Sequence, residues 1–357
     1  MNSIQKETVY VGLSGGVDSS VTALRLLQQG YKVVGVFIKV WHPEFLPCNW
    51  EVERLDAMRV AAWLGIPFVT CDAENDYRDK VAKLFIDQYS QGLTPNPDIW
   101  CNTYVKFGTF FEFARKNKAD KIATGHYAQI KNVSGQYQLH RGVDRNKDQS
   151  YFLWQLSEEK LSFTLFPIGD SDKDTIRKEA LQAGLPTAHK PDSQGICFLG
   201  QINIKEFLSH YIDLKQGPVI DIHGEEVGTH HGALIYTLGQ RHGFTIDSKH
   251  TAKTPFYVVG KNIETNTLTV NDKPKTTNFD EQFILESCNW INDRPNENDS
   301  ILIQFRHRQK PISTKIKSLD HNQAVVIMPQ NCEQPASGQS CVVYSRDGVC
   351  FGGGVIV

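Results

Sequence analysis

The sequence predicts an α/β protein, in which an N-terminal doubly wound parallel sheet is followed by a small β-rich central module and a C-terminal antiparallel β-barrel. Strand-like and helix-like segments alternate through the first half of the 357 residues, which is typical of parallel α/β sheets. Beyond about residue 205 the segments become short, alternating and separated by polar turns, as in small barrels. The length suits two or three domains, and this change of pattern divides the chain at 1–204, 205–275 and 276–357.

The N-terminal elements follow from apolar patterning. Continuous apolar or β-branched runs predict strands, and apolar residues spaced three to four apart predict helices. Ligands of doubly wound sheets bind beyond the carboxyl ends of the strands, so we expect the functional site in the loops after Gly12, Val40 and Thr124. The predicted strands are 8–12, 32–40, 67–71 and 121–124, and the predicted helices are 19–29 and 51–64.

The second half is predicted to form hairpins and barrel strands. GPVIDIHGEEVG (217–228) predicts a hairpin with His223 and Gly224 at its turn, and YVVGKNIETNTLTV (257–270) predicts another. Five histidines between positions 223 and 250 are not joined by a Cys or carboxylate at a usual ligand spacing, so we expect no metal site there. The predicted barrel strands lie within 301–308, 312–319, 323–329 and 340–345.

Charge and composition exclude several classes of protein. The chain has 38 Lys and Arg against 40 Asp and Glu, a formal charge of −2, which excludes a globally basic nucleic-acid binder but permits a local basic patch. No apolar stretch is long enough to span a membrane, and the start lacks the apolar core of a secretory signal. We therefore expect a soluble, cytoplasmic protein with no membrane partner.

Two of the eight cysteines stand in unusual contexts. No two cysteines have the Cys-x-x-Cys spacing of a zinc ribbon or an iron–sulfur pair, so reduced thiols are expected, and a cluster held by dispersed ligands stays open. Cys101 follows two prolines and Cys197 follows a glycine, which predicts exposed loop positions. The cysteines in or beside apolar strand-like runs are expected to be small buried hydrophobes; they are Cys71, Cys288, Cys332, Cys341 and Cys350.

A glycine-rich loop lies between the first predicted strand and the first predicted helix. The string GLSGGVDSS (12–20) has three glycines, which let main-chain N–H groups approach an anion at a helix N-terminus. It lacks the Gly-Lys-Ser or Gly-Lys-Thr of a Walker A loop and the GxGxxG spacing of a dinucleotide fold. The loop therefore predicts a phosphate site of a different kind.

The string SGGVDSS (14–20) resembles the pyrophosphate loop of the ATP pyrophosphatases, which cleave ATP between the α and β phosphates and adenylate a carbonyl oxygen. The resemblance implies an adenine nucleotide α-hydrolase-like fold with ATP and Mg²⁺ as cofactors. It implies that Asp18 orders the loop or a Mg²⁺ ion, that the Ile38 backbone contacts adenine, and that Gly125 leaves room for the nucleotide. The implied ATP-binding set is Gly12, Leu13, Ser14, Gly15, Gly16, Val17, Asp18, Ser19, Ile38 and Gly125.

Four further segments resemble the bacterial tRNA-specific 2-thiouridylases, which replace O2 of the wobble uridine of tRNA by sulfur. They are NPDxxCN, GHY, KDQSYFL and DSxGICF, and the resemblance extends over nearly the whole chain. It implies that Cys197 carries a persulfide, that Cys101 is the catalytic nucleophile, and that a transient Cys101–Cys197 disulfide forms. Such a bond requires Cα atoms within about 7 Å. The sulfur donor would be a cysteine desulfurase or a sulfur-relay protein.

The same resemblance implies how a tRNA anticodon loop is held. Asn96, Pro97 and Asp98 are expected against the target base, which must leave the stack to be modified. Two basic clusters, in RGVDRNKDQ and FRHRQK, fit local RNA contacts despite the acidic total. The other expected tRNA contacts are His126, Lys147, Asp148, Gln149, Arg306, His307 and Gln339.

Two alternatives remain open from the sequence. A different ATP pyrophosphatase, such as a lysidine synthase-like enzyme, would keep SGGVDS but would not need both Cys101 and Cys197. A non-catalytic RNA-binding sulfur carrier would keep the cysteines but would not need an intact phosphate loop. The presence of both features favours the thiolating enzyme.

Overall fold

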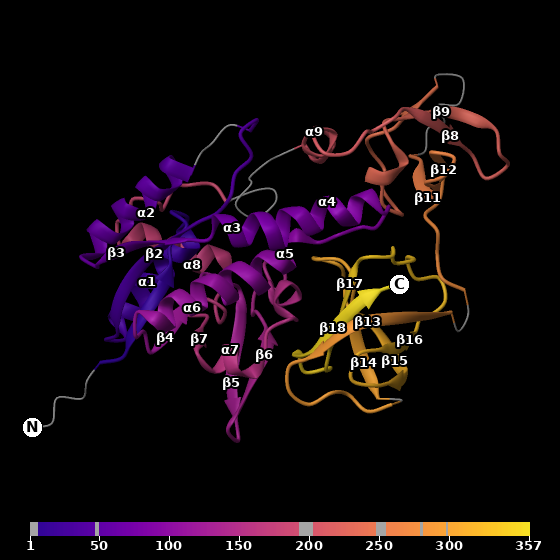
Figure 1. Cartoon of the computed structure of the whole chain (residues 1–357). Helices are drawn as coiled ribbons and strands as arrows, with labels where there is room; N and C mark the ends of the chain where they lie inside the picture. The colour runs from indigo at the N-terminus through magenta and orange to yellow at the C-terminus, as the bar shows by residue number, and fades with distance from the viewer. Residues whose placement is uncertain (1–5, 47–49, 193–202, 248–254, 279–280, 298) are drawn as a thin grey trace, which may run out of the picture.

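The computed structural model of the chain describes residues 6–46, 50–192, 203–247, 255–278, 281–297 and 299–357. Cys48, Cys197 and His250 lie outside the described residues. Figure 1 shows three modules: the N-terminal sheet with its helices at the left, the central module at the upper right and the barrel at the lower right.

Five parallel strands form the N-terminal sheet, in the order β3-β2-β1-β4-β7. The chain runs from β1 outward to β3 on one side and continues with β4 on the other side of β1, so the switch point lies between β1 and β4, where doubly wound sheets bind their ligands. Four strands confirm the prediction to within one or two residues, and the two-residue edge strand β7 was not predicted. The bounds are β1 (Thr8–Gly12), β2 (Lys32–Lys39), β3 (Phe68–Asp72), β4 (Lys121–Ala123) and β7 (Thr164–Leu165).

Helices cover both faces of this sheet. The predicted helices are confirmed as α1 (Val17–Gln28) and α2 (Trp50–Leu64), which pack on one apolar core of the sheet. A core on the other face is covered by α5 (Pro97–Trp100), the π-helical η2 (Cys101–Thr109) and α6 (Phe110–Lys116). The remaining helices are α3 (Glu74–Tyr77), η1 (Arg78–Ala82), α4 (Lys83–Ser90), η3 (Ser150–Leu153), α7 (Glu158–Ser162), α8 (Lys173–Gln182), α9 (Ile204–Ser209) and η4 (Ala233–Ile235).

The central module is a five-stranded sheet in the order β10-β9-β8-β12-β11. Both predicted hairpins are confirmed, and Gly224, with a φ of +89°, lies in the turn of the first. The two hairpins join through a parallel pairing of β12 with β8. The bounds are β8 (Gly217–Ile220), β9 (Glu226–His230), β10 (Thr245–Ile246), β11 (Tyr257–Asn262) and β12 (Thr267–Asn271).

The C-terminal module is an antiparallel barrel, as predicted. Its strands follow the order β13-β16-β15-β14-β17-β18, and pairing of β13 with β18 closes the sheet, which leaves no free edge in the cylinder. The bounds are β13 (Gln282–Trp290), β14 (Ser300–Gln304), β15 (Ile312–Leu319), β16 (Ala324–Ile327), β17 (Ser340–Tyr344) and β18 (Val349–Ile356).

An N-terminal hairpin extends the sheet of the barrel. Strands β5 (Ala128–Val133) and β6 (Gln136–Arg141) pair with each other, and β6 also pairs with β18 through His140 and Leu139. Tyr151 reinforces this joint, because its buried hydroxyl donates to the Phe305 carbonyl at 3.1 Å and lies 3.0 Å from the Ser340 carbonyl oxygen. The first and third modules therefore share a sheet, which the sequence did not indicate.

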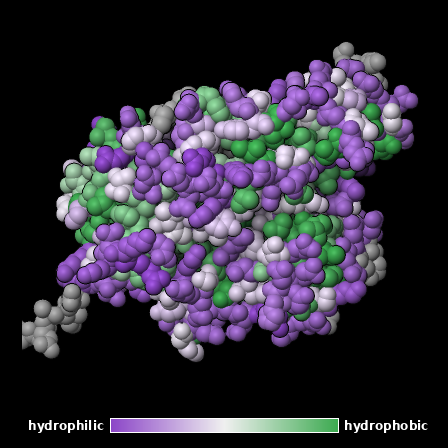
Figure 2. Space-filling model, in the orientation of Figure 1, coloured by the Kyte–Doolittle hydropathy of each residue, from purple (hydrophilic) through white to green (hydrophobic). Residues whose placement is uncertain are grey.

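Polar side chains dominate the face of the molecule shown in Figure 2, and apolar residues gather in separate patches. One such patch lies at the left, over α2 and β3 (Figure 2); α2 exposes Val52, Leu55, Met58 and Trp63. Within the described ranges, no helix combines the length and the apolarity that a membrane crossing requires.

Candidate active site

The phosphate loop joins β1 to α1 at the carboxyl edge of the sheet. The Ser14 amide donates to Ser19 Oγ at 3.2 Å, the two serine Oγ atoms lie 3.2 Å apart, and Ser19 Oγ donates to the Gly16 carbonyl at 3.2 Å. Gly16 is the N-cap of α1 and brings no capping side chain, so the first amides of the helix can donate to an anion. Leu13 and Val17, two other members of the implied ATP set, have side chains buried in the core and offer only backbone groups.

Helix α2 packs directly against the loop at Gly15. A Cβ on Gly15, whose φ is +71°, would lie 2.8 Å from the Glu53 carbonyl oxygen and 2.9 Å from Asp56 Cβ. Only glycine lets the two segments approach this closely. Burial raises the pKa of Glu53 against the opposing charge of Lys190, whereas a hydrogen bond from Lys190 lowers the pKa of Asp56. The sequence predicted α2 but not its contact with the loop.

Asp18, in the first turn of α1, is held by two partners from other segments. The Tyr127 hydroxyl donates to Asp18 Oδ1 at 2.8 Å, and Lys173 Nζ lies 2.7 Å from the same oxygen. Burial, followed by the charge of Asp18, raises the pKa of Tyr127, so its hydroxyl stays a proton donor. These contacts fit a loop-ordering role for Asp18. The motif GHY indicated the region of Tyr127, but no pattern pointed to Lys173.

Gly125 brings the end of β4 onto the start of α1. A Cβ at this position would lie 2.9 Å from the Asp18 carbonyl carbon and 2.9 Å from the Ser19 nitrogen. The backbone of the phosphate loop therefore occupies the place that a side chain at position 125 would take, and the expected role of Gly125 toward the nucleotide stays a prediction. This glycine is required by close packing of two backbones, and its effect on ATP binding would act through the shape of the loop.

His126 is buried beside a lysine that the sequence analysis missed. His126 Nδ1 lies 2.7 Å from Thr124 Oγ1, and Nε2 lies 3.4 Å from Lys106 Nζ. Burial, followed by the charge of Lys106, lowers the pKa of His126 well below its usual value, so the ring is neutral at pH 7. Because the side chain is only 5% exposed, its expected contact with RNA stays a prediction.

Cys101 lies in a helix and not in the exposed loop that the prolines indicated. Asn96 caps α5 by accepting from the Asp98 amide at 3.2 Å, and Pro97 takes the first helical position, where its missing N–H removes no hydrogen bond. The helical run continues through Cys101, whose exposure is 0%. The prediction of an exposed thiol is therefore wrong, because Pro97 starts a helix where it was expected to mark a loop.

Asn102, next to Cys101, has an unpaired buried acceptor. Its side chain is 3% exposed and Nδ2 donates to the Asp98 carbonyl at 2.9 Å, while Oδ1 has no hydrogen-bond partner among the described residues. Buried polar atoms are nearly always paired, so this oxygen is one of the few exceptions among the described residues, and it lies next to Cys101 in sequence. Asn102 ends the segment NPDxxCN, and this position in the motif could have identified it from the sequence.

Helix α6, which follows the Cys101 segment η2, packs at the end of β1, where the phosphate loop begins. A Cβ on Gly12 would lie 3.7 Å from Phe110 Cε1 in α6, 3.7 Å from Ile38 Cδ1 in β2 and 3.7 Å from Thr124 Cγ2 after β4. Ile38 is buried there, which leaves its backbone as the group available to adenine. The start of the phosphate loop and α6 therefore share the β1–β4 switch point, and Cys101 lies in the segment that directly precedes α6.

Asp148 holds the turn between the β5–β6 hairpin and η3. Its Oδ2 pairs with Arg141 Nε at 2.5 Å, and its Oδ1 accepts from the Gly142 and Ser150 amides at 3.0 and 3.1 Å. The carboxylate is 5% exposed, so it points inward, whereas the resemblance placed Asp148 against tRNA. Gln149 likewise accepts from the Tyr127 amide at 3.0 Å. Their roles toward RNA stay predictions.

We expect Asp148→Ala to lower the free energy of unfolding by about 3 to 5 kcal/mol, because it leaves the charge of Arg141 buried without its partner. Urea unfolding followed by circular dichroism checks this. Asp79→Ala is the control, because its ion pair with Arg78 is exposed, and we expect that variant to unfold like the unaltered chain. Equal stability of the two variants would contradict the structural role of Asp148.

The basic cluster FRHRQK of the barrel contacts the basic cluster RGVDRNKDQ of the N-terminal module. His307 Nε2 lies 3.1 Å from the Asp148 carbonyl oxygen, and burial lowers the pKa of His307. Arg306 forms an ion pair with Glu333 and donates to the Leu238 carbonyl at 2.8 Å, so it bridges the barrel and the central module. The structure therefore brings KDQS and Arg306–His307 together, as shared RNA contacts require. Gln339 lies on the barrel, where its Oε1 accepts from the Ala336 amide at 2.9 Å.

All three modules meet just before the expected target-base residues Asn96–Asp98. The Thr94 amide donates to the Ser337 carbonyl of the barrel at 3.1 Å, and Thr94 Oγ1 lies 3.1 Å from Thr237 Oγ1 of the central module. A base held by Asn96–Asp98 would therefore lie at a junction that an RNA on several modules could reach.

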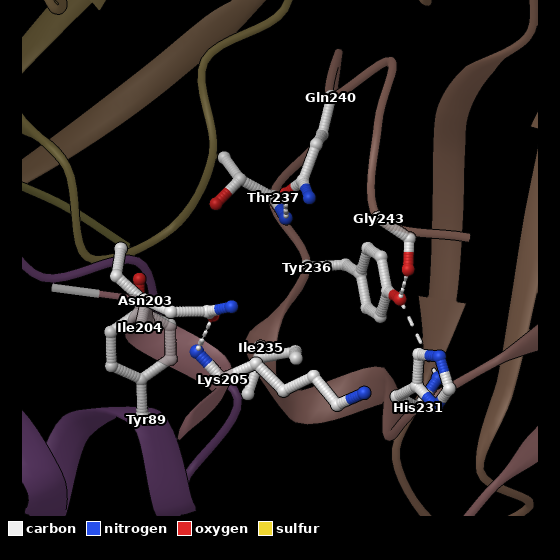
Figure 3. A pocket seen from close by; sticks show the side chains of 10 residues that line it. All are labelled: Tyr89, Asn203, Ile204, Lys205, His231, Ile235, Tyr236, Thr237, Gln240 and Gly243. Carbon is white, nitrogen blue, oxygen red and sulfur yellow. Dashed lines mark hydrogen bonds between the residues drawn. The ribbon is translucent and has the colours of Figure 1, made fainter. Parts of the chain in front are cut away.

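A separate pocket of about 560 Å³ opens between α4, α9 and the central module. Figure 3 shows Tyr89 on one side and Tyr236 and His231 on the other, with the Lys205 side chain between them and Gln240 at the top of the view. The described residues contain no group of three or more His, Cys, Asp or Glu side chains that could hold a metal ion. Of the neighbouring histidines, His230 at the end of β9 is 1% exposed, whereas His231 is exposed.

Comparisons with known proteins cover the whole chain. Residues 7–201 match the family description "tRNA methyl transferase HUP domain", residues 205–272 "tRNA methyl transferase PRC-barrel domain", and residues 280–356 "Aminomethyltransferase beta-barrel domain". A tRNA-specific 2-thiouridylase MnmA of Bacillus cytotoxicus is 42% identical over 361 residues, which cover 100% of this chain and 96% of that protein. The chain belongs to the tRNA-specific 2-thiouridylase family.

Other members of the thiouridylase family match equally closely. The protein of the same name from Staphylococcus carnosus is 42% identical and covers 99% of this chain and 96% of its own length, and that from Staphylococcus saprophyticus is 43% identical and covers 98% and 94%. Among solved structures, the U34-tRNA thiolase NcsA of Methanococcus maripaludis covers 60% of this chain and 68% of that chain at 19% identity and a TM-score of 0.36. That likeness adds nothing to the family assignment.

Proposed function

We propose that this protein uses ATP to replace O2 of the wobble uridine, U34, of tRNA by sulfur. The observation that carries the proposal is that α6, which directly follows the Cys101 segment η2, packs through Phe110 at Gly12, where the phosphate loop begins. A thiolation of a carbonyl requires both an ATP site and a cysteine that delivers sulfur. Membership of the thiouridylase family supports the same reaction.

Activation comes first in the proposed reaction. A uracil carbonyl oxygen is a poor leaving group, so O2 attacks the α-phosphorus of ATP, and pyrophosphate departs from the same phosphorus. The Gly15 and Gly16 amides and the hydroxyls of Ser14 and Ser19 are the groups that would hold the pyrophosphate. Mg²⁺ usually binds through one or two carboxylates and substrate phosphates, and Asp18 is the carboxylate at the loop that fits it.

Sulfur transfer follows activation. Cys197 carries the sulfur as a persulfide, Cys197–S–SH. The Cys101 thiolate attacks the Cys197 sulfur, the Cys101–Cys197 disulfide forms, and hydrosulfide leaves. Hydrosulfide attacks C2 of the adenylated uridine, and AMP departs with the original O2. A thiol reductant then restores both cysteines. This order requires Cys101 and Cys197 to approach within about 7 Å between Cα atoms.

The partners follow from this chemistry. The tRNA anticodon loop presents U34 to Asn96, Pro97 and Asp98, and the family resemblance points to tRNAs that read Lys, Glu and Gln codons. A cysteine desulfurase or a sulfur-relay protein supplies the persulfide sulfur. ATP, reduced thiols and tRNA occur together in the cytoplasm, where we place the reaction.

The matched domain descriptions name methyl transfer, whereas the full-length relatives are named for thiolation. A methyl transfer would not use both the phosphate loop and Cys101, whereas thiolation uses both. A lysidine synthase-like reaction would use the loop but would not need the cysteine. We therefore favour thiolation over both.

One assay tests the proposal. The protein is incubated with ATP, Mg²⁺, a persulfide donor and unmodified tRNA, and nucleoside mass spectrometry is combined with measurement of AMP and pyrophosphate. We expect 2-thiouridine together with AMP and pyrophosphate. Pyrophosphate without thiolated base would indicate another ATP pyrophosphatase, and the absence of both products would indicate a non-catalytic RNA-binding carrier.

A further inference from the structure

Strand β3 is an edge strand of the N-terminal sheet. It pairs with β2 on one side, and no described strand pairs with it on the other side. Just before the strand, the Pro67 carbonyl accepts from the Gly35 amide at 2.9 Å, so Pro67 faces β2 and does not protect the outer side as an edge proline can. Backbone groups point to alternate sides along a strand, so those of Phe68, Thr70 and Asp72 face outward. We call these outward groups the β3 edge.

Helix α2 places an arginine and an apolar stripe beside the β3 edge. Arg54 Nε donates to Thr70 Oγ1 at 3.1 Å, and its guanidinium lies 5.6 Å from the centre of the Phe68 ring. Arg54 Nη1 also lies 3.1 Å from Met58 Sδ. On the same side of the helix, Leu55 and Met58 are 44% and 38% exposed. The apolar patch over α2 and β3 in Figure 2 therefore continues up to an open sheet edge.

Two opposite charges at this edge have no ionic partner within the part of the chain that the structure describes. Arg54 contacts a hydroxyl, a thioether and an aromatic ring. Asp72, whose Oδ1 accepts from the Glu74 amide at 3.0 Å, is exposed at the other end of the strand. Side chains at positions 68, 70 and 72 share one face of the strand, so Asp72 lies on the face that α2 covers.

We propose that the β3 edge pairs with the β3 edge of a second copy of this chain. The strands run antiparallel about a twofold axis at Thr70, which faces its own copy, and Phe68 faces Asp72 of the second copy. All three outward positions then form hydrogen-bonded pairs, and two five-stranded sheets become one of ten strands. A twofold interface uses the same patch on both chains.

This register satisfies both the charges and the apolar stripe. It places Asp72 of the second copy next to Phe68, where the Arg54 guanidinium lies, and symmetry repeats this pair. An axis perpendicular to the sheet keeps both α2 helices on one face, two to three strand spacings or roughly 10 to 14 Å apart. Leu55 and Met58 can therefore contact their copies. A strand of another protein would have to supply an acidic group at the same register, whereas a second copy brings one by symmetry.

The β3 edge lies far from the other two modules. Figure 1 shows α2 and β3 at the left end of the molecule, and the central module and the barrel at the right. Pairing through β3 would therefore leave the expected RNA contacts of the barrel uncovered in both copies.

Sedimentation velocity of the full chain over about 1 to 100 μM tests the proposal. We expect a species with twice the mass of the 40.3 kDa chain. Arg54→Asp and Asp72→Arg should each weaken association by about tenfold or more, because like charges then meet across the axis. The variant that carries both substitutions restores opposite charges and should recover association. Circular dichroism shows whether each variant is folded.

Arg115→Asp is the matched control, because Arg115 of α6 lies 5.5 Å from the Phe111 ring centre but belongs to the helices on the other face of the sheet; it should associate like the unaltered chain. A single chain at every concentration would overturn the proposal and leave the β3 edge to a strand of another protein. Association that neither single reversal weakens, or that the double variant does not recover, would also overturn it. Failure of the proposed function would be seen separately, as absence of 2-thiouridine in the complete assay.

Discussion

Cys101→Ser is expected to lower the formation of 2-thiouridine by roughly a thousandfold or more. A serine hydroxyl cannot attack a persulfide to form a disulfide, so hydrosulfide is not released. Cys101 lies in a helix with an exposure of 0%, and serine is close to cysteine in size, so the helix and the neighbouring phosphate loop should persist. Pyrophosphate release in the presence of tRNA should therefore continue, and nucleoside mass spectrometry with a pyrophosphate assay checks both products.

Two further cysteine variants test whether the loss is specific to the proposed sulfur transfer. Cys197→Ser should show the same loss, because it removes the proposed sulfur carrier. Cys350→Ser is the matched control, because Cys350 is also buried and belongs to the same apolar cluster as Cys101; it should keep thiolation. Burial raises the pKa of the Cys350 thiol to about 12, and no step of the proposed reaction uses this residue. Thiolation retained in Cys101→Ser would refute the assignment of the nucleophile.

Much of the fold could be predicted because it rests on local patterns. Strands of continuous apolar residues and the paired hairpins are set by neighbours in sequence, and the structure confirms them. The pairing of β6 with β18 could not be predicted, since it joins His140 to Val349 across most of the chain. Pairings between such distant segments leave no periodic signal in either one.

The helix from residue 97 was missed for a different reason. Proline is both a loop residue and a favoured first residue of a helix, and the choice here depends on the Asn96 cap. Cysteine burial shows the same limit: Cys71, Cys341 and Cys350 are buried as expected, whereas Cys288 and Cys332 are partly exposed. Apolar neighbours in sequence do not decide which face of a strand is covered.

Sequence motifs identified some residues of the candidate site and missed others. The phosphate loop and GHY could be found as strings, because their glycines are needed for close backbone approach. Lys106 and Lys173 could not be assigned a role, because single charged residues acquire one only when the fold brings distant segments together. A motif can also suggest a different contact from the one in the structure. The motif that contains Asp148 suggested a contact with RNA, whereas its carboxylate forms an ion pair with Arg141.

Gly15→Ala should weaken ATP binding by roughly a hundredfold, about 2.7 kcal/mol. Two penalties combine in this variant. The φ of +71° disfavours any side chain, and the added Cβ would lie 2.8 Å from the Glu53 carbonyl oxygen of α2, which is backbone and cannot rotate away. The loop must therefore move away from α2, and the backbone amides that would hold the pyrophosphate no longer point toward one common anion. Titration calorimetry with the α,β-methylene analogue of ATP, which cannot be cleaved between these phosphates, measures the loss.

Gly30→Ala separates the two penalties. Gly30 has a φ of +90°, yet a Cβ there would meet nothing within 4 Å, so this variant carries the backbone strain without the clash. Both variants should lose stability by about 1 kcal/mol from the positive φ, and only Gly15→Ala should lose nucleotide. Equal ATP affinity in the two variants would mean that the contact between Gly15 and α2 does not shape the loop.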